Sequence, residues 1–142
     1  MMNMRFLLLL LTGVIVFSVG CIRSTSNVAT PTGGATAAVV QDNFTIKDMR
    51  EAIHYGCLEK NWKATDINAN TIEATITVRN KHTVVVTIPY TATTYSINYK
   101  DSVNMNYKPH SDGTFSINRS YNNWVNNLDN AIRTNIAKKR PN

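Results

Sequence analysis

The sequence contains few cysteines and few charged residues. Two cysteines among 142 residues can supply neither a disulfide scaffold nor the four ligands of a structural zinc module. Charged residues make up 17% of the chain, against about 25% in an average globular protein. Hydrophobic residues make up 43%, a share too high for a wholly disordered chain. No glycine-rich phosphate loop follows an expected strand, which excludes the doubly wound nucleotide-binding folds.

Residues suited to metal binding or catalysis are sparse and dispersed. None of the histidines His54, His82 and His110 shows the pairing at three- or four-residue spacing, or the cluster of histidine, cysteine and carboxylate, that a zinc or iron site needs. His110-Ser111-Asp112 contains the residue types of a catalytic triad, but neighbours along a loop cannot adopt triad geometry. The nine acidic residues are spread along the chain, and nothing selects a glycosidase-type pair. The sequence therefore predicts no metal ion, no cofactor and no catalytic residue.

The first twenty residues have the pattern of a secretory leader. Arg5 is the only charged residue before an uncharged run from Phe6 to Ile22. This run is shorter than the roughly 20 apolar residues of a bilayer-spanning helix, and glycine, serine and threonine interrupt it. A basic start, a short apolar core and small residues before a break define a signal peptide, which we place at residues 1–20.

The leader ends in Ser18-Val19-Gly20-Cys21, which resembles the lipobox of bacterial lipoproteins. The resemblance implies that the Cys21 thiol is acylated and becomes the mature N-terminus, so that fatty acyl chains anchor the protein to a membrane. The alternative is an ordinary signal peptide that leaves Cys21 as a free thiol. In lipoproteins of two-membrane bacteria an aspartate after the cysteine tends to retain the protein at the inner membrane. Ile22 stands there, so the resemblance implies the outer membrane, on its periplasmic face.

The chain is basic, with 15 Lys and Arg against 9 Asp and Glu. An excess of bases invites a nucleic-acid partner, but a secreted address argues against one. The one basic cluster, Lys138-Lys139-Arg140, stands at the end of an expected helix, where cations complement the helix dipole. We interpret that cluster as a solvated helix end, with weak attraction to anionic lipid or cell-wall polymer as the alternative.

Composition divides the rest of the chain into a linker and one domain. Residues 21–43 follow the leader and are rich in Ser, Thr, Ala and Gly without periodicity, so we expect a flexible linker with a reach of about 25 Å. The folded domain is expected at residues 44–142. Thr45 and Asp48 suit a capping box, and Ile46, Met49, Ile53 and Cys57 form one apolar stripe. We expect a helix over residues 45–60, whose Ala52 and Gly56 allow close packing.

From Trp62 onward the apolar period changes to two, which indicates strands. We expect strands over residues 62–65, 72–78, 82–90 and 95–99, joined by turns at 68–70, 80–81 and 91–92. A polar loop should span residues 101–117. Apolar residues then recur at helical spacing, which predicts a helix over residues 118–138. The predicted fold is a two-layer α+β sandwich, an antiparallel meander of about four strands covered on one face by an N-terminal and a C-terminal helix.

Several blocks of the domain resemble a family of proteins. The most specific are Tyr95-Ser96-Ile97 and Tyr121-Asn122-Asn123-Trp124, with Ala74–Arg79 before them and Asn104–Tyr107 between them. Together they are similar to small proteobacterial lipoproteins that carry one α+β domain behind a signal peptide. The likeness covers residues 45–138. That family has no assigned reaction, so the resemblance implies a fold and an address only.

Polar and aromatic residues concentrate in the last third of the chain. Hydroxyl, amide and indole groups beside flat apolar faces suit the recognition of sugars, peptides or a protein surface. The candidate binding surface comprises Asn104, Asn106, Tyr107, Tyr121, Asn122 and Trp124. The alternative is that the aromatic residues belong to the core and the asparagines cap turns. If Trp124 is in the core, its replacement by alanine should destabilise the domain by about 3–5 kcal/mol.

These features together predict a membrane-anchored periplasmic lipoprotein that acts as a non-enzymatic binding or accessory module of the cell envelope. Its partner would be an envelope protein or a cell-wall polymer. Two alternatives are a cell-wall-modifying hydrolase whose site the sequence does not reveal, and a homo-oligomeric stress or assembly accessory that associates through a sheet face or an edge strand.

Overall fold

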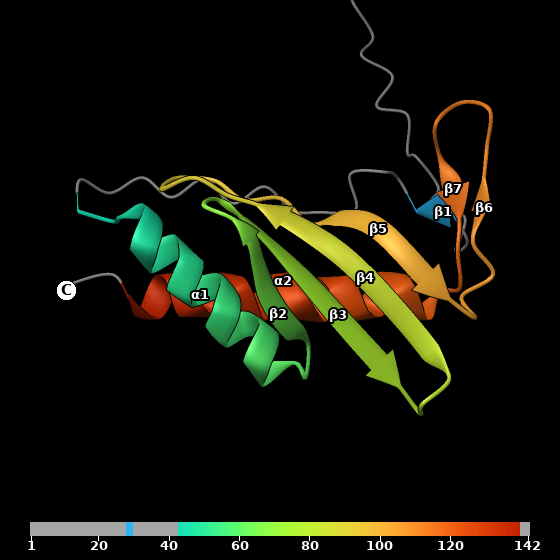
Figure 1. Ribbon diagram of the computed structural model, residues 1–142, viewed down its shortest axis with the longest axis horizontal. Helices are drawn as coiled ribbons and strands as arrows, with labels where there is room; N and C mark the ends of the chain where they lie inside the picture. Colours follow the sequence, from blue (N-terminus) through green and yellow to red (C-terminus); the bar gives the residue numbers. More distant parts are fainter. Residues whose placement is uncertain (1–27, 30–42, 140–142) are drawn as a thin grey trace, which may run out of the picture.

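A computed structural model describes residues 28–29 and 43–139. Within these ranges the chain forms two helices, a four-stranded antiparallel sheet and a small second sheet (Figure 1). The helices are α1 (Ile46–Glu59) and α2 (Ser120–Lys138), and the large sheet has the order β2 (Lys63–Asn68), β3 (Thr71–Val78), β4 (His82–Pro89) and β5 (Asn98–Val103). This arrangement confirms the predicted α+β class and its four-stranded meander. The signal peptide at 1–20, Cys21 and most of the linker 21–43 lie outside the described residues.

Helix α1 begins at the predicted capping box. The hydroxyl oxygen of Thr45 accepts a hydrogen bond from the Asp48 backbone at 3.2 Å, and the Asp48 carboxylate accepts one from the Thr45 backbone at 2.9 Å. These bonds satisfy two N–H groups that a helix start otherwise leaves unpaired. The buried residues of α1 follow the predicted stripe from Met49 to Cys57, including Ala52 and Gly56. Ile46, the first residue of that stripe, is exposed instead.

Strands β3 and β4 form a hairpin with one buried face. Thr71 pairs with Pro89 at one end and Val78 with His82 at the other. The turn between them holds Arg79 and Asn80 with positive φ angles of 54° and 49°, one residue before the predicted turn. The inward residues alternate as the period of two predicts, and they comprise Ile72, Ala74, Ile76, Val84, Val86 and Ile88.

The chain after β4 departs from the prediction. We expected a strand over residues 95–99, but β5 begins at Asn98 and continues to Val103. A turn closed by Thr91 precedes it, and the register between β4 and β5 shifts around Lys100. Such a bulge adds one residue to a strand, and only pairing with a neighbour determines where it falls. Tyr95 and Ile97 still face the core, although they precede the strand.

The predicted polar loop over residues 101–117 is also partly wrong. It contains the end of β5 and a hairpin of β6 (Lys108–Pro109) and β7 (Phe115–Ser116). Met105, Phe115 and Ile117, three apolar residues within that segment, are buried in the core. Strand β1 (Val28–Ala29), from the predicted linker, pairs antiparallel with β7 and gives the second sheet the order β1-β7-β6.

Helix α2 runs behind the large sheet and is crossed by α1 near the β2 edge (Figure 1). It begins two residues later than predicted and ends where predicted, at Lys138. Its apolar stripe, from Tyr121 to Ile136, is buried against the sheet and α1. At the crossing, a Cβ on Gly56 would lie 2.7 Å from Cγ1 of Ile132. The predicted close packing of α1 therefore takes place against α2. Neither described helix is long and apolar enough to cross a membrane.

Candidate functional site

Three segments that are distant in sequence meet where α2 begins, and we call this region the α2 N-terminal end. The Asn104 side-chain amide donates a hydrogen bond to the Lys81 carbonyl at 2.8 Å, and the His82 ring nitrogen Nδ1 donates one to the Asn104 carbonyl at 2.8 Å. The Asn118 backbone N–H donates to the Met105 carbonyl at 2.7 Å. These bonds hold the β3–β4 turn, the loop after β5 and the start of α2 together.

Two adjoining hollows lie at this end. The first, of about 460 Å³, is lined by Asn106, Lys108, Ser116, Ile117, Asn118 and Arg119. The second, of about 370 Å³, is lined by Val78, Arg79, His82, Met105, Asn118, Ser120 and Trp124. Asn118 lines both, so they form one continuous polar surface around the helix start. Amides, hydroxyls, cations and one indole surround this surface, which suits a polar ligand.

The cations of the α2 N-terminal end lack acidic partners. Arg79, Lys108 and Arg119 line the hollows together with no carboxylate, and no described residue forms an ion pair with any of the three. The first turn of α2 also carries no acidic residue. Because a helix start has partial positive charge, it adds to the potential of these cations. The end therefore attracts anions.

The opposite end of α2 is neutralised. The Lys139 ammonium lies 2.6 Å from the Glu51 carboxylate, and the Lys138 ammonium lies 3.3 Å from that of Glu59. The hydrogen bond and charge of Lys139 lower the pKa of Glu51 below its ordinary value. Lys138 and Lys139 thus stand at a helix end, as we interpreted them, and they also form ion pairs with α1. Arg140 lies outside the described residues. Arg79, Lys108 and Arg119, at the other end of the helix, have no such ion pair among the described residues.

The six residues predicted as a binding surface have different environments. Asn106 and Trp124 line the hollows, one in each. Tyr107 is 40% exposed and stacks on Tyr99, with ring centroids 4.6 Å apart. Asn104 ties two segments together, and both Asn104 and Asn106 adopt positive φ angles, which asparagine tolerates better than most residues. Asn122 is half-buried and lines neither hollow.

Tyr121 does not belong to an exposed surface. Its side chain is fully buried, so its inclusion in the binding surface is wrong and the core alternative holds for it. Its ring packs edge-on against Tyr99 and Phe115, with centroids 5.8 and 6.2 Å apart. Burial raises the pKa of the Tyr121 hydroxyl well above its ordinary value, and this hydroxyl has no partner among the described residues. Tyr95 is likewise in the core.

Trp124 has one side against the core and the other toward the second hollow. Because it is half-buried, we expect Trp124→Ala to lower the free energy of unfolding by about 2 kcal/mol, less than the 3–5 kcal/mol typical of a fully buried tryptophan. Urea denaturation would measure the loss. Trp124→Phe, which keeps an aromatic ring against the core, is the control and should lose less. A loss above 4 kcal/mol would contradict a half-buried position.

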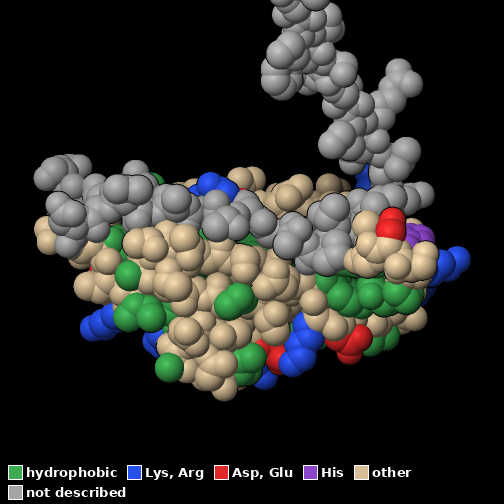
Figure 2. Space-filling view, turned by 90° about the horizontal axis from the view of Figure 1, so that it is seen from above, with side chains coloured by type: hydrophobic (Ala, Val, Ile, Leu, Met, Phe, Trp, Pro, Cys, Tyr) green, Lys and Arg blue, Asp and Glu red, His purple; other side chains and the backbone are tan. Residues whose placement is uncertain are grey.

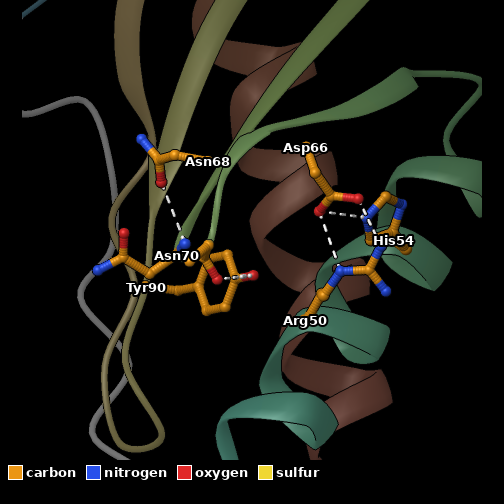
Figure 3. Close-up of polar contacts among 7 residues, drawn as sticks. Arg50, His54, Asp66, Asn68, Asn70 and Tyr90 are labelled. Atoms are coloured by element: carbon orange, nitrogen blue, oxygen red, sulfur yellow. Dashed lines mark hydrogen bonds and ion pairs between the residues drawn. The ribbon is translucent and has the colours of Figure 1, made fainter.

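A second polar cluster joins α1 to the edge strand β2 (Figure 3). The Asp66 carboxylate accepts hydrogen bonds from Nε of Arg50 at 3.0 Å and Nε2 of His54 at 3.1 Å. The hydrogen bond from Arg50 lowers the pKa of Asp66 below its ordinary value. Nearby, the Tyr90 hydroxyl donates to the Ala69 carbonyl at 3.2 Å and supports the turn after β2. The cluster contains no nucleophile, and the His54 side chain is half-buried within it.

The described residues show no complete catalytic or metal-binding set. His110 Nε2 lies 2.6 Å from the Ser116 hydroxyl, but no described carboxylate bonds the other nitrogen, and Asp112 instead accepts hydrogen bonds from Thr114. Burial raises the pKa of the Cys57 thiol to about 12, which makes it unreactive at neutral pH. Residues 28–29 and 43–139 contain no group of three or more metal-ligating side chains.

The basic residues of the site escaped the sequence analysis. Arg79, Lys108 and Arg119 are separated by about thirty and about ten residues, and no motif in the sequence connects them. Of the six residues predicted as a binding surface, Asn106 and Trp124 line the hollows, and the other four do not. Comparison with protein-family models, curated proteins and solved structures finds no match to this chain. Its function is therefore argued from the site itself.

Proposed function

We propose that this protein is a lipid-anchored, non-enzymatic binding module on the periplasmic face of the bacterial outer membrane. Its α2 N-terminal end would hold an anionic component of the cell envelope, either a polymer, a protein or a lipid surface. The observation that carries the proposal is the pair of hollows lined by Arg79, Lys108 and Arg119 without a carboxylate. The leader, the lipobox-like Ser18–Cys21 and the resemblance to proteobacterial lipoproteins support the address.

The lining of the hollows favours binding over hydrolysis. Guanidinium, ammonium and amide N–H groups donate hydrogen bonds and suit phosphate or carboxylate ligands. Hydrolysis of a glycosidic or acyl bond needs a second carboxylate or an activated nucleophile beside its base. Trp124 offers a flat apolar face next to these donors, as sites for sugars and amphipathic ligands do. Both the hydrogen-bond donors and the indole of Trp124 therefore suit a binding role.

Replacing the acylated cysteine should separate anchoring from folding. We expect Cys21→Ser to move the protein from the salt-washed membrane fraction to the soluble fraction, because two or more acyl chains anchor stably and none would remain. Its circular dichroism spectrum and melting temperature should not change. Fractionation after a high-salt wash measures the effect, and intact-mass analysis of the native protein should show fatty acyl groups on an N-terminal Cys21.

Cys57→Ala is the matched control, because Cys57 is buried in α1 and does not take part in anchoring. It should remain in the membrane fraction. The proposed address is wrong if the Cys21→Ser protein stays in the washed membrane, or if the native protein has no acyl group.

A further inference from the structure

We infer that the anionic component held by the α2 N-terminal end is the headgroup surface of the same bilayer that the acyl chains of Cys21 enter. This inference rests on the proposed lipid anchor and names the partner of the proposed site, an anionic phospholipid surface. The domain would lie with its β6–β7 hairpin toward the membrane and the C-terminal end of α2 away from it. Three independent features of the chain support this orientation.

The first feature is the point at which the anchored segment meets the domain. Strand β1 pairs with β7, Val28 opposite Ser116 and Ala29 opposite Phe115. Seven residue steps separate Cys21 from Val28, and an extended chain spans at most about 3.6 Å per residue. The hairpin can therefore lie no more than about 25 Å from the acylated cysteine. The first hollow, to which Ser116 and Lys108 contribute, lies at this tethered end.

The second feature is the uneven distribution of unpaired charge. Arg79, Lys108 and Arg119 have no ion-pair partner among the described residues, and two acidic residues are near them in the chain. Asp112 accepts hydrogen bonds from Thr114, and Asp101 accepts one from the Ser102 backbone. Their carboxylates offset part of the positive charge, although neither forms an ion pair with the three cations. Each basic residue near an anionic membrane surface strengthens binding by about fivefold. Three such residues supply weak, salt-sensitive binding. The acyl anchor would hold the domain beside the headgroups, so that even weak binding is favoured by a high effective concentration.

The third feature is an exposed apolar group at the same end. Val103, the last residue of β5, is 53% exposed, and Tyr107, in the loop that follows β5, is 40% exposed. Figure 2 shows hydrophobic side chains gathered at the end of the molecule where β5, β6 and β7 lie, with basic, acidic and histidine side chains nearby. Tyrosine is enriched at membrane interfaces because its ring is apolar and its hydroxyl is polar. Cations and the exposed apolar side chains of Val103 and Tyr107 at one end of the domain suit a headgroup layer.

The far end of α2 does not offer such a surface. The 19 residues of α2 extend about 28 Å, so Lys138 and Lys139 lie that far from the helix start. Both lysines are paired with carboxylates of α1. The carboxylates of Glu51 and Glu59 thus offset the lysines at this end, whereas no carboxylate lines the hollows at the tethered end.

Vesicle flotation tests the inference without the anchor. The chain that begins at residue 21, carrying Cys21→Ser, would be mixed with vesicles of phosphatidylcholine alone or with about 30 mol% phosphatidylglycerol. The contacts described above lie within residues 28–29 and 43–139, all of which this chain contains. We expect binding to the anionic vesicles, little binding to the neutral ones, and loss of binding when salt rises to about 0.5 M. Adding Lys108→Glu with Arg119→Glu should weaken binding by about tenfold or more.

Lys47→Glu with Lys63→Glu is the matched control, because it changes the net charge equally on α1 and β2, away from the hairpin. It should weaken binding by less than about threefold. If the hairpin variant does not fold by circular dichroism, Lys108→Gln and Arg119→Gln, tested singly, replace it. The inference fails if the protein binds neutral and anionic vesicles equally, or if both charge variants lose affinity equally. It also fails if soluble tetragalacturonate, a probe for an anionic polymer ligand, binds more tightly than the vesicles. These failures would leave the anchor at Cys21 intact, because fractionation of the acylated protein tests it separately.

Discussion

Replacing Gly56 by alanine should destabilise the domain strongly, with a loss of about 2–3 kcal/mol in the free energy of unfolding. A Cβ at this position would lie 2.7 Å from Cγ1 of Ile132, 2.8 Å from its backbone nitrogen and 3.0 Å from its Cα. Two of these atoms belong to the backbone of α2, so no change of rotamer can relieve the contact. The helices would have to separate along the whole buried crossing. Alanine favours a helix over glycine by about 1 kcal/mol, and the expected loss of about 2–3 kcal/mol already includes this stabilisation.

A loss of this size should lower the melting temperature by about 10–20 °C in a domain of roughly 100 residues. Thermal denaturation measures it directly. In a Cys21→Ser background the buried thiol of Cys57 is the only one left, and its labelling at pH 8 should become faster as the domain opens more often. Leu58→Ala is the control on the same helix, because Leu58 is 71% exposed and its replacement should change stability by less than about 0.5 kcal/mol. A Gly56→Ala protein as stable as the wild type would refute the close crossing of α1 and α2.

Removing the carboxylate of Asp129 should have a comparable effect, with a loss of about 2–4 kcal/mol. The Tyr95 hydroxyl donates a hydrogen bond to Asp129 Oδ1 at 2.5 Å, and Nε of Arg133 donates to Oδ2 at 2.8 Å. Tyr95 and Asp129 are both buried. Burial and the neighbouring carboxylate raise the pKa of the Tyr95 hydroxyl, which therefore stays protonated and remains a donor. Asp129→Ala would leave that donor buried without a partner, and an unsatisfied buried donor destabilises a protein more than the loss of both partners does.

A double-mutant cycle isolates this pair. Tyr95→Phe alone should lose about 1–2 kcal/mol, and the cycle with Asp129→Ala should show a coupling of about 1–2 kcal/mol, measured by urea denaturation. Arg133→Gln is the control for the exposed partner. It should lose less than about 1 kcal/mol, because the Arg133 side chain is 45% exposed and water replaces its contact. Additive effects of Tyr95→Phe and Asp129→Ala would show that the two side chains do not interact.

Local patterns predicted the helices and most of the sheet accurately. The capping box at Thr45, the stripe that follows it and the stripe of α2 all act within a few residues, so they are visible in the sequence. The strands of the β3–β4 hairpin alternate strictly because one face is buried and the other is wet. The segment over residues 95–117 was predicted less well. Its bulge near Lys100, the buried Met105 and the β6–β7 hairpin depend on partners elsewhere in the chain.

The candidate site was predicted only in part, for the same reason. Asn106 and Trp124 were identified because amides and aromatic residues are distinctive in sequence. Tyr121 was misplaced because its spacing alone does not distinguish a core aromatic from an exposed one. Arg79, Lys108 and Arg119 were missed, since a basic residue in a polar loop carries no signal of whether an acidic residue faces it.

By itself, the sequence determined the two helices, the strands up to Pro89, the α+β class, and the expectation of a leader and an acyl anchor. These depend on side-chain periodicity and on short motifs, which are properties of neighbouring residues. Only the tertiary structure decided which cations lack a partner, which aromatic rings are buried, and that α1 lies against α2 at Gly56. Pairing and burial are set by contacts between segments tens of residues apart, and the free energies of such contacts depend on geometry that no local pattern encodes.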